Sequence, residues 1–153
     1  MSEKVFMRMA VDLSIENVLS SKGGPFGAVI VSPEGKIVSM GANRVCSRND
    51  PSAHAEIMAI RVACKKLNTP FLTDHAIFSS CEPCPMCFSC IRWAKIKNVF
   101  YALDRKDAAE IGFDDKKIYD EIMKGEQDMT RIDCNGAKDA FKMWSESKTK
   151  KTY

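Results

Sequence analysis

The sequence contains no long apolar run, because none of its hydrophobic stretches approaches the roughly 20 residues that a membrane-spanning helix requires. Its start, Met1 to Val5, also lacks the basic and then apolar order of a secretory signal peptide. We therefore expect neither a membrane protein nor a secreted one. With 153 residues, 45% hydrophobic and 28% charged, the chain has the size and composition of one globular domain, which we place at residues 1–153.

The sequence also lacks a large excess of positive or negative charge. Lys and Arg together number 23 and Asp and Glu number 20, which leaves a formal net charge of +3. The one basic cluster, Lys148 to Lys151, lies near the end of the chain. Such a short charge run favours a solvated tail over a nucleic-acid-binding arm. We therefore expect no membrane partner and no nucleic-acid partner.

Histidine is scarce, with two residues, whereas cysteine is frequent, with seven. Seven cysteines cannot all pair within one chain, which indicates a reducing, cytoplasmic compartment where thiols stay free or bind metal. Four of them recur at intervals of three between Cys81 and Cys90. The isolated cysteines and the second histidine are predicted to be structural: Cys46, Cys64, Cys134 and His75.

Cys84 and Cys87 have the Cys-x2-Cys spacing with which two thiolates reach one metal ion. His54, thirty residues earlier, forms a His-x-Glu motif with Glu56. His-x-Glu followed by Pro-Cys-x-x-Cys is the signature of zinc-dependent base deaminases. We predict that His54, Cys84 and Cys87 bind one Zn²⁺ and leave its fourth position to water. Glu56 is then the catalytic residue that moves a proton from this water to the substrate.

The cysteine run allows two other interpretations. The four cysteines between Cys81 and Cys90 follow a spacing close to that of ferredoxins, which favours an iron–sulfur cluster but leaves His54 and Glu56 without a role. A closed structural zinc site in a non-catalytic module would need a fourth ligand, which Cys81 could supply. If neither holds, Cys81 and Cys90 are buried or half-buried thiols outside the metal site.

The apolar periodicity predicts an α/β protein. A buried strand, a helix and a second strand follow one another around the cysteine run, which implies a crossover connection, a parallel strand pair and a mixed sheet. We expect His54 in the first turn of a helix that starts at Asp50. The predicted elements are a helix at 5–19, hairpin strands at 26–31 and 37–40, a helix from 50 to 67, a strand at 76–78, a helix at 84–94, a strand at 98–103, and short helices at 107–111, 116–123 and 137–144.

Several stretches besides the metal motif carry a family resemblance: 23–27, 41–43, 49–56, 80–87 and 112–115. Over nearly its whole length the chain resembles the small bacterial-type guanine deaminases of the cytidine deaminase-like superfamily. The resemblance implies a three-layer α/β/α fold with a mixed five-stranded sheet and one zinc ion. It also implies a homodimer whose C-terminal segments are exchanged by domain swapping.

The same resemblance implies the activity and the substrate contacts. The implied reaction is the zinc-dependent hydrolytic deamination of guanine to xanthine and ammonia, a step of purine metabolism. Asn43 is expected to bind the purine and Phe26 to line the pocket. Asp115 and Tyr153 are expected to complete the site from the partner chain.

An acidic residue in the pocket wall would explain a preference for guanine. Guanine presents two adjacent donors, N1–H and the 2-amino group, which one carboxylate accepts in parallel. Asp114 and Asp115 are the candidates, although either could instead cap the helix that begins near Lys116. The acidic pair argues against a tRNA adenosine deaminase, because it would lie beside phosphates. Guanosine and other nucleobases or nucleosides stay open as substrates.

Overall fold

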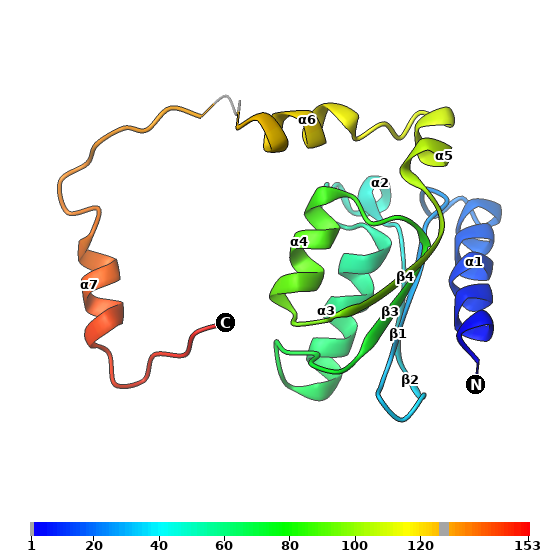
Figure 1. Cartoon of the computed structure of the whole chain (residues 1–153), viewed down its shortest axis with the longest axis horizontal. Helices are drawn as coiled ribbons and strands as arrows, with labels where there is room; N and C mark the ends of the chain where they lie inside the picture. Colours follow the sequence, from blue (N-terminus) through cyan, green and yellow to red (C-terminus); the bar gives the residue numbers. More distant parts are fainter. Residues whose placement is uncertain (1, 126–128) are drawn as a thin grey trace.

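The computed structural model describes residues 2–125 and 129–153 of the chain. A sheet separates helix α1 on one side from helices α3 and α4 on the other (Figure 1). Each predicted strand and each longer predicted helix is present, with an additional short helix, α2. The elements are α1 Glu3–Leu19, β1 Gly27–Val31, β2 Ile37–Ala42, α2 Val45–Arg48, α3 Ala55–Leu67, β3 Ala76–Cys81, α4 Pro85–Trp93, β4 Asn98–Leu103, α5 Arg105–Glu110, α6 Lys116–Lys124 and α7 Asp139–Glu146.

The sheet has the strand order β2-β1-β3-β4. Strand β1 pairs antiparallel with both β2 and β3, whereas β3 and β4 are parallel, as the strand-helix-strand order predicts. The prediction of five strands is wrong, because the described ranges form four. After Leu103 the chain continues into helices α5 and α6, and none of the later residues that the structure describes forms a strand beside β4.

Two apolar clusters hold the three layers together. Phe6 and Ala10 of α1 pack against Val29 and Phe78 on one face of the sheet. On the opposite face, α3 and α4 cover a larger cluster that includes Ile30, Ala59, Ile60, Ile77 and Ile91. Strand β1 is buried along its whole length because both of its faces are covered. These clusters confirm the predicted three-layer arrangement.

Strand β2 and helix α3 approach each other closely at Gly41. A Cβ atom on this glycine would lie 2.3 Å from the carbonyl oxygen of Ala55 and 2.5 Å from the amide nitrogen of Ala59. Two residues before Gly41 in β2, the Ser39 hydroxyl donates to the carbonyl oxygen of Ala59 at 2.8 Å. Both neighbours of Gly41 are backbone atoms of α3, so only glycine fits without a shift. The start of α3 is thereby fixed against the sheet.

Helix α3 begins later than predicted. Residues 50–53 form turns, in which the Asp50 carboxylate accepts a hydrogen bond from the Ser52 amide at 2.8 Å. The helix starts at Ala55, and His54 is its N-cap in an extended conformation. The local side-chain bond to Ser52 stabilises a turn at the expense of a helix, which is common for aspartate. His54 therefore flanks the helix and does not lie in its first turn.

The C-terminal part of the chain contributes little to this body. Helices α6 and α7 contain no buried residue, and Figure 1 shows them extending away from the sheet and its covering helices. Their large apolar side chains are exposed, among them Ile118, Ile122, Met123, Phe141 and Trp144. None of the helices in the described ranges has the length and hydropathy to cross a bilayer.

Candidate active site

The predicted metal ligands and Glu56 converge where α3 and α4 begin. His54 and Cys84 are the N-caps of α3 and α4, and both have extended backbones, with ψ of 157° and 168°. Residues two apart within a helix point about 200° apart, so His54 and Glu56 could not share a pocket inside a helix. Because His54 lies outside α3, its ring and the Glu56 side chain face the same site.

His54, Cys84 and Cys87 form a compact donor set. The Nδ1 atom of His54 lies 3.6 Å from the Sγ atom of Cys84. The ring nitrogen and the two sulfur atoms all lie within 4.8 Å of one another, and within the described ranges no other such group is found. One imidazole nitrogen and two sulfurs are the donor types of three-ligand catalytic zinc sites.

The charge distribution in this set fits a cation. A hydrogen bond from Cys87, and a further one with His54, lower the pKa of the Cys84 thiol to about 4. The bond to Cys84 raises the pKa of His54, while the same thiolate and burial raise the pKa of Cys87. The partial positive charge at the start of α4 also stabilises the thiolate. A second thiolate requires a compensating cation here, which a divalent metal ion provides.

Glu56 adds a buried carboxyl group beside the donor set. It lies in the first turn of α3 and only 6% of its surface is exposed. One carboxyl oxygen accepts from the Cys87 thiol at 3.5 Å, and the other accepts from the Ser79 hydroxyl at 3.3 Å. Burial raises the pKa of Glu56. A carboxyl group with a raised pKa is suited to exchange protons near neutral pH.

The two outer cysteines of the run lie apart from this set. The Cys81 thiol donates to the carbonyl oxygen of Asp104 at 3.6 Å, and burial raises its pKa to about 11. Cys90 is half-buried against the apolar cluster under α3 and α4. The geometry therefore pairs Cys84 and Cys87 with a histidine and does not gather four thiols, as an iron–sulfur cluster requires.

Asn43 and Phe26 lie opposite each other at the ends of β2 and β1, where the Asn43 amide donates to the Phe26 carbonyl oxygen at 3.2 Å. The next residue, Arg44, donates from its amide to the carbonyl oxygen of Ala53, which precedes His54, at 2.9 Å. We call Asn43 and Phe26 the Asn43 wall.

The Oδ1 atom of Asn43 accepts hydrogen bonds from the amides of Gly24 at 3.4 Å and Val45 at 3.3 Å. Its Nδ2 group makes no hydrogen bond within the described ranges, so its donors are available to a ligand. The Phe26 ring meets the Phe113 ring edge to face, with their centroids 5.0 Å apart.

Asn17, which the sequence analysis missed, fixes this wall. Its buried Nδ2 group donates to the carbonyl oxygens of Gly24 at 2.8 Å and Asn43 at 3.1 Å, while Arg44 donates to its Oδ1 atom. A Cβ atom on Gly23 would lie 2.2 Å from the Asn43 carbonyl oxygen. Asn17 follows Phe6 and Ala10 along the buried face of α1, and an amide on an apolar face is the signal that could have identified it.

The acidic pair divides into two roles. Asp114 is exposed and accepts a hydrogen bond from the Lys116 amide at 2.9 Å, so it stabilises the start of α6. Asp115 is half-buried, and its side chain makes no capping bond. Burial raises the pKa of Asp115, and the Cys84 thiolate raises it further. The charge of Cys84 in the same chain therefore influences Asp115, whereas the resemblance implies that Asp115 acts in the partner's site.

Tyr153 does not reach the donor set of its own chain. Its ring lies 5.8 Å from the ring of Trp93, at the end of α4 opposite to Cys84, and it is largely exposed. Nine helical residues separate these two ends by about 13 Å along the axis. A role of Tyr153 in a site therefore requires another arrangement of the C-terminal segment.

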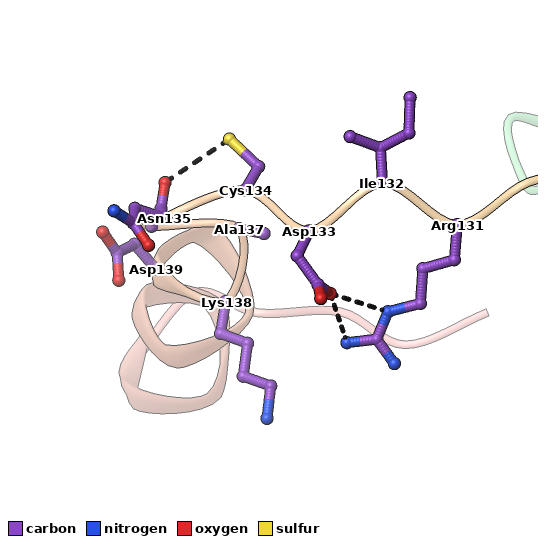
Figure 2. A pocket seen from close by; sticks show the side chains of 9 residues that line it. Arg131, Ile132, Asp133, Cys134, Asn135, Ala137, Lys138 and Asp139 are labelled. Carbon is purple, nitrogen blue, oxygen red and sulfur yellow. Dashed lines mark hydrogen bonds and ion pairs between the residues drawn. The ribbon is translucent and has the colours of Figure 1, made fainter.

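Two hollows on the surface lie away from the donor set. One of about 300 Å³ is lined by Phe88, Ser89, Arg92 and Trp93 on the outer face of α4. Another, of about 390 Å³, is formed by residues 131–139, and Figure 2 shows the Arg131–Asp133 ion pair within this segment. Its walls come from one continuous segment, so it offers no convergent chemistry. We assign the site by the donor set and not by the size of a cavity.

The fold and the donor set define a class of protein. Residues 1–103 match the family model of the cytidine and deoxycytidylate deaminase zinc-binding region. The chain belongs to this family of zinc-binding deaminases.

Within the family, the chain is similar to guanine deaminase from Bacillus subtilis (strain 168), with 46% identity over 157 aligned residues and 100% of both chains covered. The X-ray structure of guanine deaminase from Bacillus subtilis superimposes with a TM-score of 0.95 and covers 100% of this chain and 99% of the other. A tRNA-specific adenosine deaminase from Aquifex aeolicus is 45% identical over 83 residues, which cover 54% of each chain.

The low pKa of Cys84 predicts selective alkylation in metal-free protein. At pH 6, above a pKa of about 4, Cys84 is a thiolate, whereas Cys81 with a pKa of about 11 is a thiol. Iodoacetamide treatment of chelator-treated, folded protein should therefore modify Cys84 first, as measured by peptide mass spectrometry. Zinc-loaded protein is the control and should be protected. Equal modification of Cys84 and the exposed Cys46 and Cys134 would contradict the assigned charge state.

Proposed function

We propose that this protein is a zinc-dependent guanine deaminase that hydrolyses guanine to xanthine and ammonia. The observation that carries the proposal is the buried Glu56 carboxyl group beside the His54, Cys84 and Cys87 donor set. The full-length similarity to a guanine deaminase supports the choice of substrate.

His54, Cys84 and Cys87 are the proposed zinc ligands, because they supply one nitrogen and two sulfur donors at the start of two helices. When bound, zinc supplies a Lewis acid that activates water near neutral pH. The helix N-termini and the His54 hydrogen bond hold Cys84 as a thiolate ready to bind it. Cys81 and Cys90 have no ligand role in this proposal.

Glu56 is the proposed proton carrier. Its carboxylate takes a proton from the attacking water while the water oxygen forms a bond to C2 of guanine. The electrons of the C2–N3 double bond move to N3, and Glu56 delivers the proton there. Glu56 then carries the proton of the new C2 hydroxyl group to the 2-amino group, the C2–N bond breaks so that ammonia leaves, and the carbonyl group of xanthine remains. Ser79 holds one carboxyl oxygen of Glu56, which orients the side chain for both transfers.

Asp115 is the residue that we propose recognises guanine, and we call this its guanine-reading role. Its ionised carboxylate accepts from N1–H and from the 2-amino group, in a parallel arrangement that adenine and cytosine cannot form. Asp114 is unavailable for this role because it bonds the Lys116 amide. Asn43 donates from Nδ2 to an acceptor on the purine, since its Oδ1 is held by backbone amides. Phe26 stacks along the pocket wall with Phe113 behind it.

The proposed active form is a homodimer with an exchanged C-terminal segment. Helices α6 and α7 expose apolar side chains and have no buried residue, so they lack a surface to pack on within the described chain. A partner's body would supply that surface, and the partner's arm would bring its Tyr153 to this site. All seven cysteines are free, as expected for a protein in the reducing cytoplasm. The proposed reaction is a step of purine salvage or catabolism.

One assay tests the substrate. Ammonia release is measured in parallel from guanine, guanosine, adenine, adenosine, cytosine and cytidine, with zinc content determined by elemental analysis. We expect one zinc per chain and turnover of guanine above the other substrates. Preferential release from guanosine would move the assignment to the nucleoside, and iron in place of zinc would overturn the metal assignment.

Replacing Glu56 by glutamine should abolish most turnover. An amide cannot accept the water proton or pass it on, and loss of a positioned general base costs about 10²- to 10⁴-fold in rate. The variant should retain its zinc and its circular dichroism spectrum. Glu34→Gln, which alters an exposed carboxylate in the turn between β1 and β2, is a control and should keep its turnover. Near-normal turnover of Glu56→Gln would require another base.

The two aspartates provide a matched pair of variants. Asp115→Asn places a donor against the guanine donors, and a site that depends on such pairing can lose about 10⁴-fold in kcat/KM. Asp114→Asn should be nearly silent, because asparagine also caps helices well. Steady-state kinetics on guanine decides between them. If Asp115→Asn loses less than about tenfold, roughly 1.4 kcal/mol, the guanine-reading role is wrong.

Subunit exchange can be tested by complementation. Glu56→Gln chains retain Tyr153, and Tyr153→Ala chains retain Glu56, so each variant alone should be impaired. In co-expressed hybrid dimers, an exchanged arm would combine Glu56 of one chain with Tyr153 of the other and restore activity in one site. Sedimentation velocity should show a dimer in every case. A fully active monomer, or hybrids no more active than the variants alone, would contradict the exchange.

A further inference from the structure

The segment that carries Asp115 is weakly attached to the rest of the molecule. Helices α5 and α6, on either side of the Gly112 to Asp115 loop, contain no buried residue. A substrate-reading carboxylate must nevertheless be held accurately, because a displacement of about 1 Å can cost on the order of 100-fold in rate. One side-chain contact of the loop with the body is the Phe113 ring against Phe26. Phe113 precedes α6, so this contact does not by itself fix the start of the helix.

The start of α5 is tied to the loop that precedes Cys84. The Glu82 amide donates to the carbonyl oxygen of Leu103 at 2.8 Å, and the Glu82 carboxylate accepts from the Arg105 amide at 3.1 Å. Asp104 caps the same helix and accepts from the Lys106 amide at 2.8 Å. The backbone of Arg105 is therefore fixed relative to the strand ends at the donor set.

The side chain of Arg105 continues this connection to α6. Its guanidinium carbon lies 3.8 Å from the centre of the Tyr119 ring, a close cation–π contact. The Tyr119 amide donates to the Asp115 carbonyl oxygen at 3.1 Å, so Tyr119 closes the first turn of α6. Asp115 is the N-cap of that helix. The Arg105–Tyr119 contact thus fixes the turn on which Asp115 stands.

We propose that Arg105 is a positioning residue for substrate selection: stacked on Tyr119 and anchored beside Glu82, it holds the Asp115 carboxylate toward the site. This inference rests on the proposed guanine-reading role of Asp115. Arginine suits the task because its planar guanidinium stacks on a ring, whereas the ammonium group of lysine supplies a point charge only.

The positive charge of Arg105 also supports substrate binding by Asp115, because it favours the ionised carboxylate. Burial raises the pKa of Asp115, and Cys84 and Asp114 raise it further, whereas Arg105 lowers it. Tyr119, the other titratable neighbour, has a pKa raised by burial and by Asp115. Arg105 is the cation that opposes these effects, so it favours the ionised carboxylate that accepts two hydrogen bonds.

The test compares Arg105→Met with Lys106→Met, which removes the same charge from the next residue of α5. We expect Arg105→Met to lower kcat/KM for guanine by about 10- to 100-fold, mainly through KM, and Lys106→Met to stay within twofold of wild type. The acid limb of the pH profile should move to higher pH in Arg105→Met alone. Zinc content and melting temperature should be unchanged. Equal kinetics of the two variants would overturn the inference.

Three further variants separate stacking from charge. Tyr119→Phe keeps the ring and should resemble wild type, whereas Tyr119→Leu should raise KM with little change in the pH profile. Arg105→Lys should restore the pH profile and only part of the KM. A Tyr119→Leu variant with wild-type KM would overturn the role of the stack.

A double mutant distinguishes this inference from the proposed function. If Arg105 acts through Asp115, adding Arg105→Met to Asp115→Asn should cost less than twofold more, because the group it positions is already lost. Additive losses would overturn the inference while leaving the guanine-reading role intact. If wild type does not deaminate guanine, or Asp115→Asn is silent, the proposed function itself fails.

Discussion

The hydrogen-bonded Cys84 thiolate at the start of α4 is the interaction on which the site depends. Cys87 and His54 both bond to it, and these bonds explain why its pKa is low and that of His54 is raised. The arrangement exists because two helices begin at the same edge of one sheet, each with a donor as its N-cap. Glu56 gains its position from the same helix start, one residue inside α3.

The sheet keeps those two helix starts together. Parallel β3 and β4 flank α4 in sequence, so the crossover returns α4 to the face that α3 already covers. Gly41 brings the backbone of β2 against the first turns of α3, and Ser39 bonds the same helix. Asn17 joins α1, on the opposite face, to the Asn43 wall. The Asn43 wall and the donor set are therefore held by the same sheet and helices.

Most of the frame could be predicted from the sequence, because its signals are local. Periodic apolar residues located the strands and long helices, and the side chains of His54, Cys84 and Cys87 lie close together. The start of α3 was predicted too early because Asp50 caps a turn with Ser52. The fifth strand is absent from the described ranges. Asn17 and Arg105 were missed because their partners, Asn43 and Tyr119, lie on other elements.

In the proposed site, the fixed amide of Asn43 would favour one orientation of the bound purine. Two backbone amides occupy its oxygen, so the side chain cannot turn over to offer an acceptor in place of a donor. The Asp115 carboxylate, by contrast, offers acceptors only. If both residues bind guanine as proposed, a flat heterocycle between them would meet a donor on one edge and acceptors on the other. A molecule inserted the other way round would place donor against donor and acceptor against acceptor. Polarity of the walls, more than their shape, would then decide which carbon atom of the ring reaches the reactive centre.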